Sequence, residues 1–219
     1  MLALFYVVIY SITIFANSAL IGAALIRLDG GDPTLADGFR IASERAGKIV
    51  GYALIAATVG VLLRAISERS GLIGRIVIGI IGFAWNMATF LVVPVLVTED
   101  VGPIDAVRRS GELLKKTWGE QIVGNFSIGG IFTLLVFGVI LIVGIPLFAL
   151  IGAAESGAMF VLAAIIMVVL ILGISLVGST LSGIYQAALY RYAIGGEVGD
   201  YFDPELIQGA FKQKRKRGL

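Results

Sequence analysis

The sequence predicts an all-α protein, a polytopic transmembrane helical bundle of about five spans with amphipathic interfacial helices on its cytoplasmic side. Apolar residues make up 58% of the 219 residues and charged residues 15%, against about 45–50% and about 25% in soluble domains. Five long apolar stretches can cross a hydrocarbon core of roughly 30 Å, which takes about 20 helical residues. Nearly all the basic residues lie in alternate gaps between these stretches.

The expected spans form one membrane domain over residues 1–219 and cover about 2–26, 49–66, 76–97, 122–150 and 158–190. They are apolar all round, whereas the alternative, a water-soluble bundle, needs helices with polar outer faces. A signal peptide is the alternative for the first stretch. That stretch lacks a basic n-region and is longer than a typical h-region of about 7–15 residues.

The last two stretches are longer than a bilayer requires. We expect the fourth to kink at Pro146, because proline breaks the helical hydrogen-bond ladder. We expect the fifth either to bend near residues 173–178 or to extend into the cytoplasm with Tyr185, Gln186 and Tyr190.

Charge predicts the orientation in the cell membrane. Of the 17 basic residues, all except Arg64, Arg69 and Arg75 lie after the first, third or fifth span. Lys and Arg close to span ends are retained in the cytoplasm. We therefore predict a cytoplasmic C-terminus and an external N-terminus. Arg64, at the outer end of its span, is expected to reach the membrane interface with its long side chain.

Each cytoplasmic gap carries a proline at the expected start of a helix, namely Pro33, Pro103 and Pro204. Proline suits the first helical turn, and a preceding aspartate can cap it. We expect interfacial helices at 33–48, 103–118 and 204–212. Apolar residues recur every three or four positions in the first two, at Leu35, Phe39, Ala42, Ala46 and Ile49 and at Ile104, Val107, Gly111, Leu114 and Trp118. This pattern is typical of helices that lie at a membrane surface.

The basic residues of these segments are candidates for contact with anionic lipid or a protein partner. Each cation near anionic lipid contributes about 1 kcal/mol of attraction. The alternative is that these helices only connect spans and pack where the chain re-enters the bilayer. The candidate residues are Arg108, Arg109, Lys115, Lys116, Trp118, Lys212, Lys214, Arg215, Lys216 and Arg217.

Small residues follow one face of the last span at a spacing of four, at Ser175, Ser179, Gly183 and Ala187. Such a stripe lets helix backbones approach closely, which favours association in lipid. We interpret it as a helix-packing face, either within one chain or between two copies.

The residue types argue against several kinds of chemistry. The chain has no cysteine and no histidine, which removes disulfides, thiolates and the commonest general base and metal ligand. The spans contain no acidic residue or lysine, so a proton-driven transporter or an ion pump is disfavoured. We expect no enzymatic activity, no catalytic residue, no cofactor and no metal. A net charge of +2 gives no reason to expect nucleic acid.

Segments at 27–34, 62–69, 101–110, 115–121, 188–193 and 208–211 resemble those of DUF6159, an uncharacterised family of prokaryotic multi-pass membrane proteins. A looser similarity, at residues 102–104 and Trp118, links the chain to membrane domains found beside some glycerophosphodiester phosphodiesterases. The resemblance implies a helical membrane architecture and no assigned activity. Family members start with a further amphipathic segment and span, so it also implies a shortened form of a six-span protein.

Three functions remain open from the sequence. The first is a non-catalytic scaffold or accessory component that contacts lipid or a partner through its cytoplasmic helices. The second is a passive channel or small-solute permease, in which Asn17, Asn86 and Asn125 would line a polar path. The third is an accessory membrane domain of a lipid-acting enzyme.

Overall fold

The computed structural model describes residues 2–153 and 157–195, which are helical over 91% of their length and contain no strand. The elements are α1 (Leu2–Leu28), α2 (Leu35–Glu44), α3 (Ala46–Arg69), α4 (Leu72–Ala88), α5 (Val92–Thr98), α6 (Pro103–Val139), the π-helical segment η1 (Ile140–Gly144), α7 (Ile145–Ala153) and α8 (Gly157–Gly195). The all-α class is therefore confirmed.

Five segments of the described residues are long and apolar enough to cross a membrane. They are Leu4–Leu28, Ala46–Arg69, Leu72–Thr98, Ile128–Ala149 and Gly157–Gly195. Each overlaps one expected span. The third combines α4 and α5, which are joined by a short turn.

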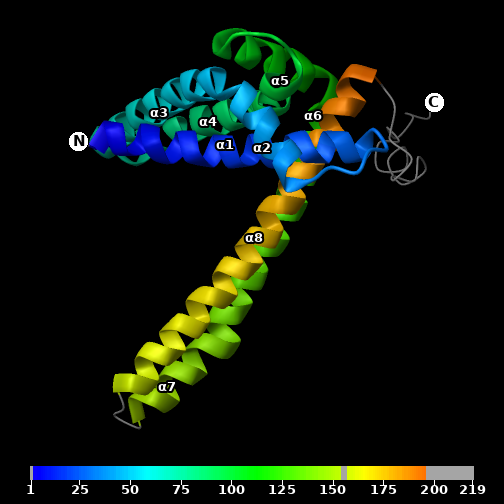
Figure 1. Cartoon of the computed structure of the whole chain (residues 1–219). Coiled ribbons are helices and arrows are strands. Elements are labelled where there is room, and N and C mark those ends of the chain that lie inside the picture. The colour runs from blue at the N-terminus through cyan, green and yellow to red at the C-terminus, as the bar shows by residue number, and fades with distance from the viewer. Residues whose placement is uncertain (1, 154–156, 196–219) are drawn as a thin grey trace, which may run out of the picture. The chain divides into compact units, whose positions relative to one another are not determined.

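The described residues divide into two compact units. Unit 1 contains residues 2–121 and 183–195, and unit 2 contains residues 122–182. In unit 1, α3 runs back beside α1 (Figure 1). The core of unit 1 surrounds α5, whose residues 92–97 are all buried. Close van der Waals packing contributes to holding such a core together.

Glycines on α1 and its neighbours allow the helices of unit 1 to approach closely. A Cβ atom on Gly38 of α2 would lie 2.6 Å from the backbone oxygen of Ala19. A Cβ atom on Gly183 of α8 would lie 2.6 Å from a methyl carbon of Leu20. Helix α1 is therefore packed tightly against both α2 and the last part of α8.

Helix α2 begins two residues later than the proline pattern suggested. Thr34 is its N-cap, and the Thr34 hydroxyl accepts a hydrogen bond from the Asp37 backbone N–H at 3.3 Å. The Thr34 backbone N–H in turn donates to Asp37 Oδ2 at 3.0 Å. This reciprocal pair of hydrogen bonds satisfies two backbone amides that the helix leaves unbonded. Thr34 and Asp37 therefore fix the start of α2, rather than a cap by Asp32 with Pro33 as the first helical residue.

Helix α6 begins at Pro103 as expected, but it is not a separate interfacial helix of residues 103–118. It continues without interruption to Val139. Helix formers such as Glu112, Leu114 and Lys115 follow one another here, and no proline separates them from the next apolar stretch. The expected helix 204–212 lies outside the described residues.

In unit 2 the helix departs from α-helical geometry just before Pro146, where a kink was expected. Residues Ile140–Gly144 form a π-helical turn, in which the Ile145 N–H donates to the Ile140 carbonyl five residues back. Pro146 follows as the second residue of α7. A wider turn accommodates a ring that would otherwise collide with the carbonyl four residues earlier.

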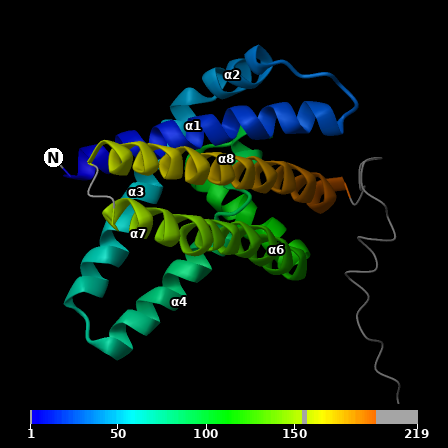
Figure 2. The same cartoon turned by 90° about the horizontal axis from the view of Figure 1, so that it is seen from below.

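In unit 2, α8 lies beside the segment formed by α6, η1 and α7 (Figure 2). The Phe148 and Phe160 ring centroids are 5.1 Å apart, and a Cβ atom on Gly178 would lie 2.8 Å from the Phe132 ring. Helix α8 has no break at 173–178 and would extend about 58 Å at 1.5 Å per residue. The expected bend near residues 173–178 is therefore not seen as a break in the helix, and Tyr185, Gln186 and Tyr190 belong to unit 1.

Candidate functional site

The described residues of the three gaps that hold most basic residues meet at one end of unit 1. Arg45 Nη1, at the junction of α2 and α3, lies 2.6 Å from Asp100 Oδ1 in the loop between α5 and α6. Arg191 Nη1, near the end of α8, lies 2.8 Å from Asp29 Oδ1 in the loop after α1. These pairs join the first gap to the third and the first to the fifth. We call this region the ionic end.

Asp100 connects two helices at the ionic end. It accepts hydrogen bonds from Lys48 and Arg45, and these bonds, first that from Lys48 and then that from Arg45, hold the pKa of Asp100 below its usual value. The Asp100 carboxylate is exposed to solvent. It is therefore charged at neutral pH and anchors the start of α3 to the loop before α6.

Glu99, the preceding residue, joins α6 and α8. Arg109 Nε donates to both Glu99 carboxylate oxygens, at 3.1 and 3.2 Å. The Tyr190 hydroxyl of α8 donates to Glu99 Oε1 at 3.1 Å, and the Thr98 hydroxyl lies 2.6 Å from that of Tyr190. Tyr190 is only 2% exposed. The Glu99 carboxylate thus satisfies a buried hydroxyl and holds a half-buried guanidinium.

Helix α6 presents a packed face and an exposed face at the ionic end. Ala106, Ser110 and Leu113 are fully buried, and the Ser110 hydroxyl accepts a hydrogen bond of 3.1 Å from the Leu91 N–H at the start of α5. At 100° per residue, Ile104 and Arg108 project from the opposite side, and Lys115 lies in line with them.

The exposed strip of α6 combines a hydrocarbon side chain with cations. Ile104 is 69% exposed, and Arg108 and Lys115 are exposed as well. Arg108 pairs only loosely with Asp105, at 3.8 Å. We define the α6 strip as Ile104, Arg108 and Lys115.

The other candidate residues are placed differently. Arg109 is bound to Glu99 and, at 3.5 Å, to Glu112, so its guanidinium holds the fold together. Lys116 and Trp118 belong to helix α6, but their side chains are not among those that the structure describes. The tail residues Lys212, Lys214, Arg215, Lys216 and Arg217 lie outside the described residues.

The small-residue stripe of α8 is divided between the two units. Gly183 and Ala187 are buried in unit 1, whereas Ser175 and Ser179 are exposed in unit 2. The close approach in unit 2 is made by Gly178 instead, against Phe132. The stripe therefore packs within the chain over its second half.

Glu99, Asp100 and Tyr190 were not predicted as site residues from the sequence. A signal was available, because two consecutive carboxylates directly after an apolar span must find cations or water. Their partners were hidden, since Tyr190 lies 91 residues away from Glu99. Within the described ranges, no group of three or more acidic side chains is arranged to hold a metal ion.

Comparison with known proteins identifies a family. The family described as "Family of unknown function (DUF6159)" matches residues 1–201. No curated protein and no solved structure matches the chain.

Proposed function

The chain belongs to the DUF6159 family, whose function is unknown, and we propose that it is a non-catalytic scaffold or accessory protein of the cell membrane. In this proposal its ionic end faces the cytoplasm and contacts anionic lipid. Five helices of membrane-spanning length support the membrane location. The excess of Lys and Arg in the gaps that meet at the ionic end supports the orientation.

The α6 strip is the observation that carries the lipid contact. Ile104, Arg108 and Lys115 share one exposed face, while the opposite face packs on α5. Since a residue of helix rises about 1.5 Å, Arg108 and Lys115 are about 10 Å apart along the axis. Two cations beside an exposed isoleucine match a surface with acidic headgroups above acyl chains.

Helix α2 of the same unit also exposes apolar side chains. Leu35 and Phe39 are exposed, and the Phe39 ring lies 6.2 Å from Phe15 of α1. The cation of α2 is neutralised, because Arg40 pairs with Asp37 and Glu44 at 3.3 Å each. We therefore assign acyl contact to α2 and charge recognition to the α6 strip.

The test compares binding of short-chain phosphatidylglycerol and phosphatidylcholine to the full chain in neutral detergent over a range of salt concentrations. We expect the wild type to prefer phosphatidylglycerol and to lose that preference as salt rises. Arg108→Gln combined with Lys115→Gln should weaken phosphatidylglycerol binding by about tenfold, given about 1 kcal/mol per cation and incomplete additivity.

Arg69→Gln is the matched control, because Arg69 is exposed but lies at the other end of α3. It should leave the preference for phosphatidylglycerol unchanged. The proposal fails if the double variant keeps the affinity and salt dependence of the wild type.

A further inference from the structure

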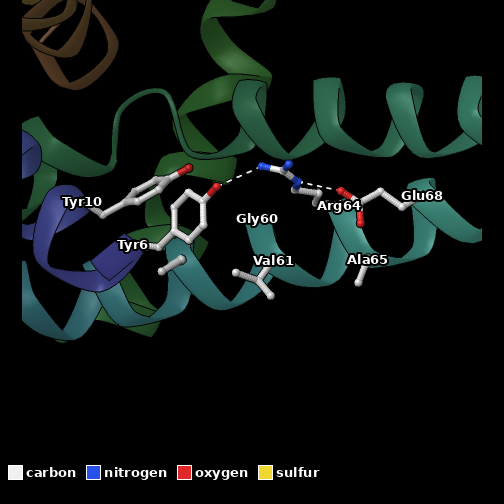
Figure 3. A pocket seen from close by; sticks show the side chains of 8 residues that line it. Tyr6, Tyr10, Gly60, Val61, Arg64, Ala65 and Glu68 are labelled. Carbon is white, nitrogen blue, oxygen red and sulfur yellow. Dashed lines mark hydrogen bonds and ion pairs between the residues drawn. The ribbon is translucent and has the colours of Figure 1, made fainter. Parts of the chain in front are cut away.

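A cavity of about 520 Å³ lies between α1 and α3, at the end of unit 1 away from the ionic end. Figure 3 shows it from close by. Its walls combine two tyrosines, an ion pair and an apolar floor. The lining residues are Tyr6, Tyr10, Ala57, Gly60, Val61, Arg64, Ala65 and Glu68. Ligand sites typically have volumes of about 300–1,000 Å³, so this space is large enough for a polar headgroup.

The rim of the cavity presents a cation and an anion side by side. Arg64 Nε donates to Glu68 Oε1 at 2.8 Å, and Arg64 Nη1 donates to the Tyr6 hydroxyl at 2.9 Å (Figure 3). The side chains of Arg64 and Glu68 remain 68% and 65% exposed. Both charged groups are therefore accessible to a ligand. Each is already paired with a group of opposite charge, as it would be with a ligand that carries both charges.

The apolar floor of the cavity belongs to one stretch of α3. Ala57, Gly60, Val61 and Ala65 are small residues, and a Cβ atom on Gly60 would come 3.5 Å from the Tyr10 hydroxyl. The missing side chain at Gly60 therefore leaves the space next to the Tyr10 hydroxyl open. The part of a lipid's acyl chains closest to the glycerol would contact this floor. The headgroup of the same lipid would contact the charged rim.

The depth of the cavity matches a membrane surface. Arg64 lies 16 positions after Lys48 on the same helix, which is about 24 Å at 1.5 Å per residue. A hydrocarbon core is about 30 Å thick, so a chain whose Lys48 lies at one interface places Arg64 close to the other. The cavity is then at the headgroup level of the leaflet opposite the ionic end.

We propose that this cavity binds a phospholipid whose headgroup carries a primary ammonium next to its phosphate, as in phosphatidylethanolamine. The Arg64 guanidinium takes the phosphate, which it can bind through two parallel N–H donors. The Glu68 carboxylate takes the ammonium, and the tyrosine ring faces add attraction for a cation. The ligand thus replaces the ion pair between Arg64 and Glu68 with two new ion pairs, one between Arg64 and the phosphate and one between Glu68 and the ammonium.

Charge selects this headgroup over the other common ones. A phosphatidylglycerol headgroup brings an anion and no cation, so Glu68 would be left facing negative charge without compensation. Phosphatidylcholine brings a quaternary ammonium that donates no hydrogen bond to a carboxylate. This site therefore differs in chemistry and location from the α6 strip, and neither proposal depends on the other.

The experiment titrates the full chain in neutral detergent with short-chain phosphatidylethanolamine, phosphatidylcholine and phosphatidylglycerol and measures the heat of binding. We expect the ethanolamine lipid to bind most tightly. Arg64→Gln should weaken it by at least about tenfold, which corresponds to about 1.4 kcal/mol. Glu68→Gln should bring the ethanolamine and choline lipids to within about twofold of each other, because the neutral amide no longer attracts the ammonium.

Arg69→Gln is the control, since Arg69 is an exposed arginine of the same helix outside the cavity. It should bind the ethanolamine lipid as the wild type does. Tyr6→Phe supplies a second variant that keeps the ring and removes only the hydroxyl that receives the Arg64 hydrogen bond. A change in ethanolamine-lipid affinity in this variant, with an unchanged melting temperature, supports the site even if Arg64→Gln does not fold.

Three results would overturn the proposal. One is equal wild-type affinity for the three lipids. Another is Arg64→Gln that folds and binds the ethanolamine lipid like Arg69→Gln. The third is competition by free phosphoethanolamine or inorganic phosphate at the same concentration as the lipid, which would identify a soluble phosphate compound as the ligand.

Discussion

The Tyr190 hydroxyl, near the end of α8, donates a 3.1 Å hydrogen bond to Glu99, directly after α5. Arg109 of α6 holds the same carboxylate. One acidic residue thereby fixes three helices at the ionic end. Since a hydrogen bond between helices in a membrane protein contributes about 0.6 kcal/mol on average and about 1.7 at most, its loss should be measurable.

Tyr190→Phe should lower the melting temperature of the detergent-solubilised chain, because Glu99 loses a buried donor. We expect a loss of about 1 kcal/mol. In a double-mutant cycle with Glu99→Gln, the two losses should not add, since both remove the same bond. Tyr190→Phe with the distant Asp37→Asn should be additive. Equal additivity in both cycles would contradict the hydrogen bond.

Gly38→Ala should destabilise the protein because the new methyl group meets the Ala19 backbone oxygen at 2.6 Å. Overpacking of this kind typically costs about 1–3 kcal/mol. Gly47→Ala is the matched control, since nothing lies within 4 Å of its Cβ position and alanine favours a helix. Thermal unfolding of the two variants should change in opposite directions. A tolerated Gly38→Ala would show that α1 and α2 are not in close contact.

Thr34→Ala should weaken the start of α2, because it removes the hydroxyl that receives the Asp37 N–H. Losing such a cap costs about 1 kcal/mol. Thr34→Ser keeps the hydroxyl and should stay close to the wild type. Amide hydrogen exchange of residues 35–38 would report the difference, with faster exchange only in the alanine variant. The cap assignment fails if serine and alanine exchange alike.

Acid should weaken the ionic end through Asp100. Hydrogen bonds from Lys48 and Arg45 lower the pKa of Asp100 in the folded state, so its contribution to stability is fully present above its unfolded pKa of about 3.9. That contribution is lost as pH falls through the lower folded pKa. Asp100→Asn should therefore flatten the acid limb of a melting-temperature profile below about pH 4. An acid limb identical to that of the wild type would contradict this role.

The all-α class and the five helices long and apolar enough to cross a membrane could be predicted from the sequence, because lipid imposes a simple demand on each segment. A long apolar stretch suffices to predict a span, whatever it packs against. The sequence also predicted that the first gap, with Lys48, and the fifth gap, with Arg191, lie at the same end. A chain that crosses a membrane repeatedly brings alternate gaps to the same side. The start of α6 at Pro103 followed from local helix chemistry.

The contacts of the ionic end could not be predicted in the same way. The hydrogen bond between Tyr190 and Glu99 and the pair of Arg45 with Asp100 depend on how distant helices pack. The inward face of α6 was also hidden, because Ser110 is polar and Ala106 is small, whereas the larger Ile104 lies outside. The cavity at Tyr6 and Arg64 joins residues 58 positions apart.

Accessibility of single cysteines in intact cells tests the central claim most directly, because the natural chain contains none. Gly47→Cys lies at the ionic end and Gly71→Cys in the gap between α3 and α4. Both glycines are exposed, with nothing within 4 Å of the Cβ position. With a membrane-impermeant maleimide, we predict labelling of Gly71→Cys in intact cells and of Gly47→Cys only after lysis. Labelling of Gly47→Cys from outside, or equal labelling of both, would contradict a protein that crosses the membrane between these positions with its ionic end in the cytoplasm.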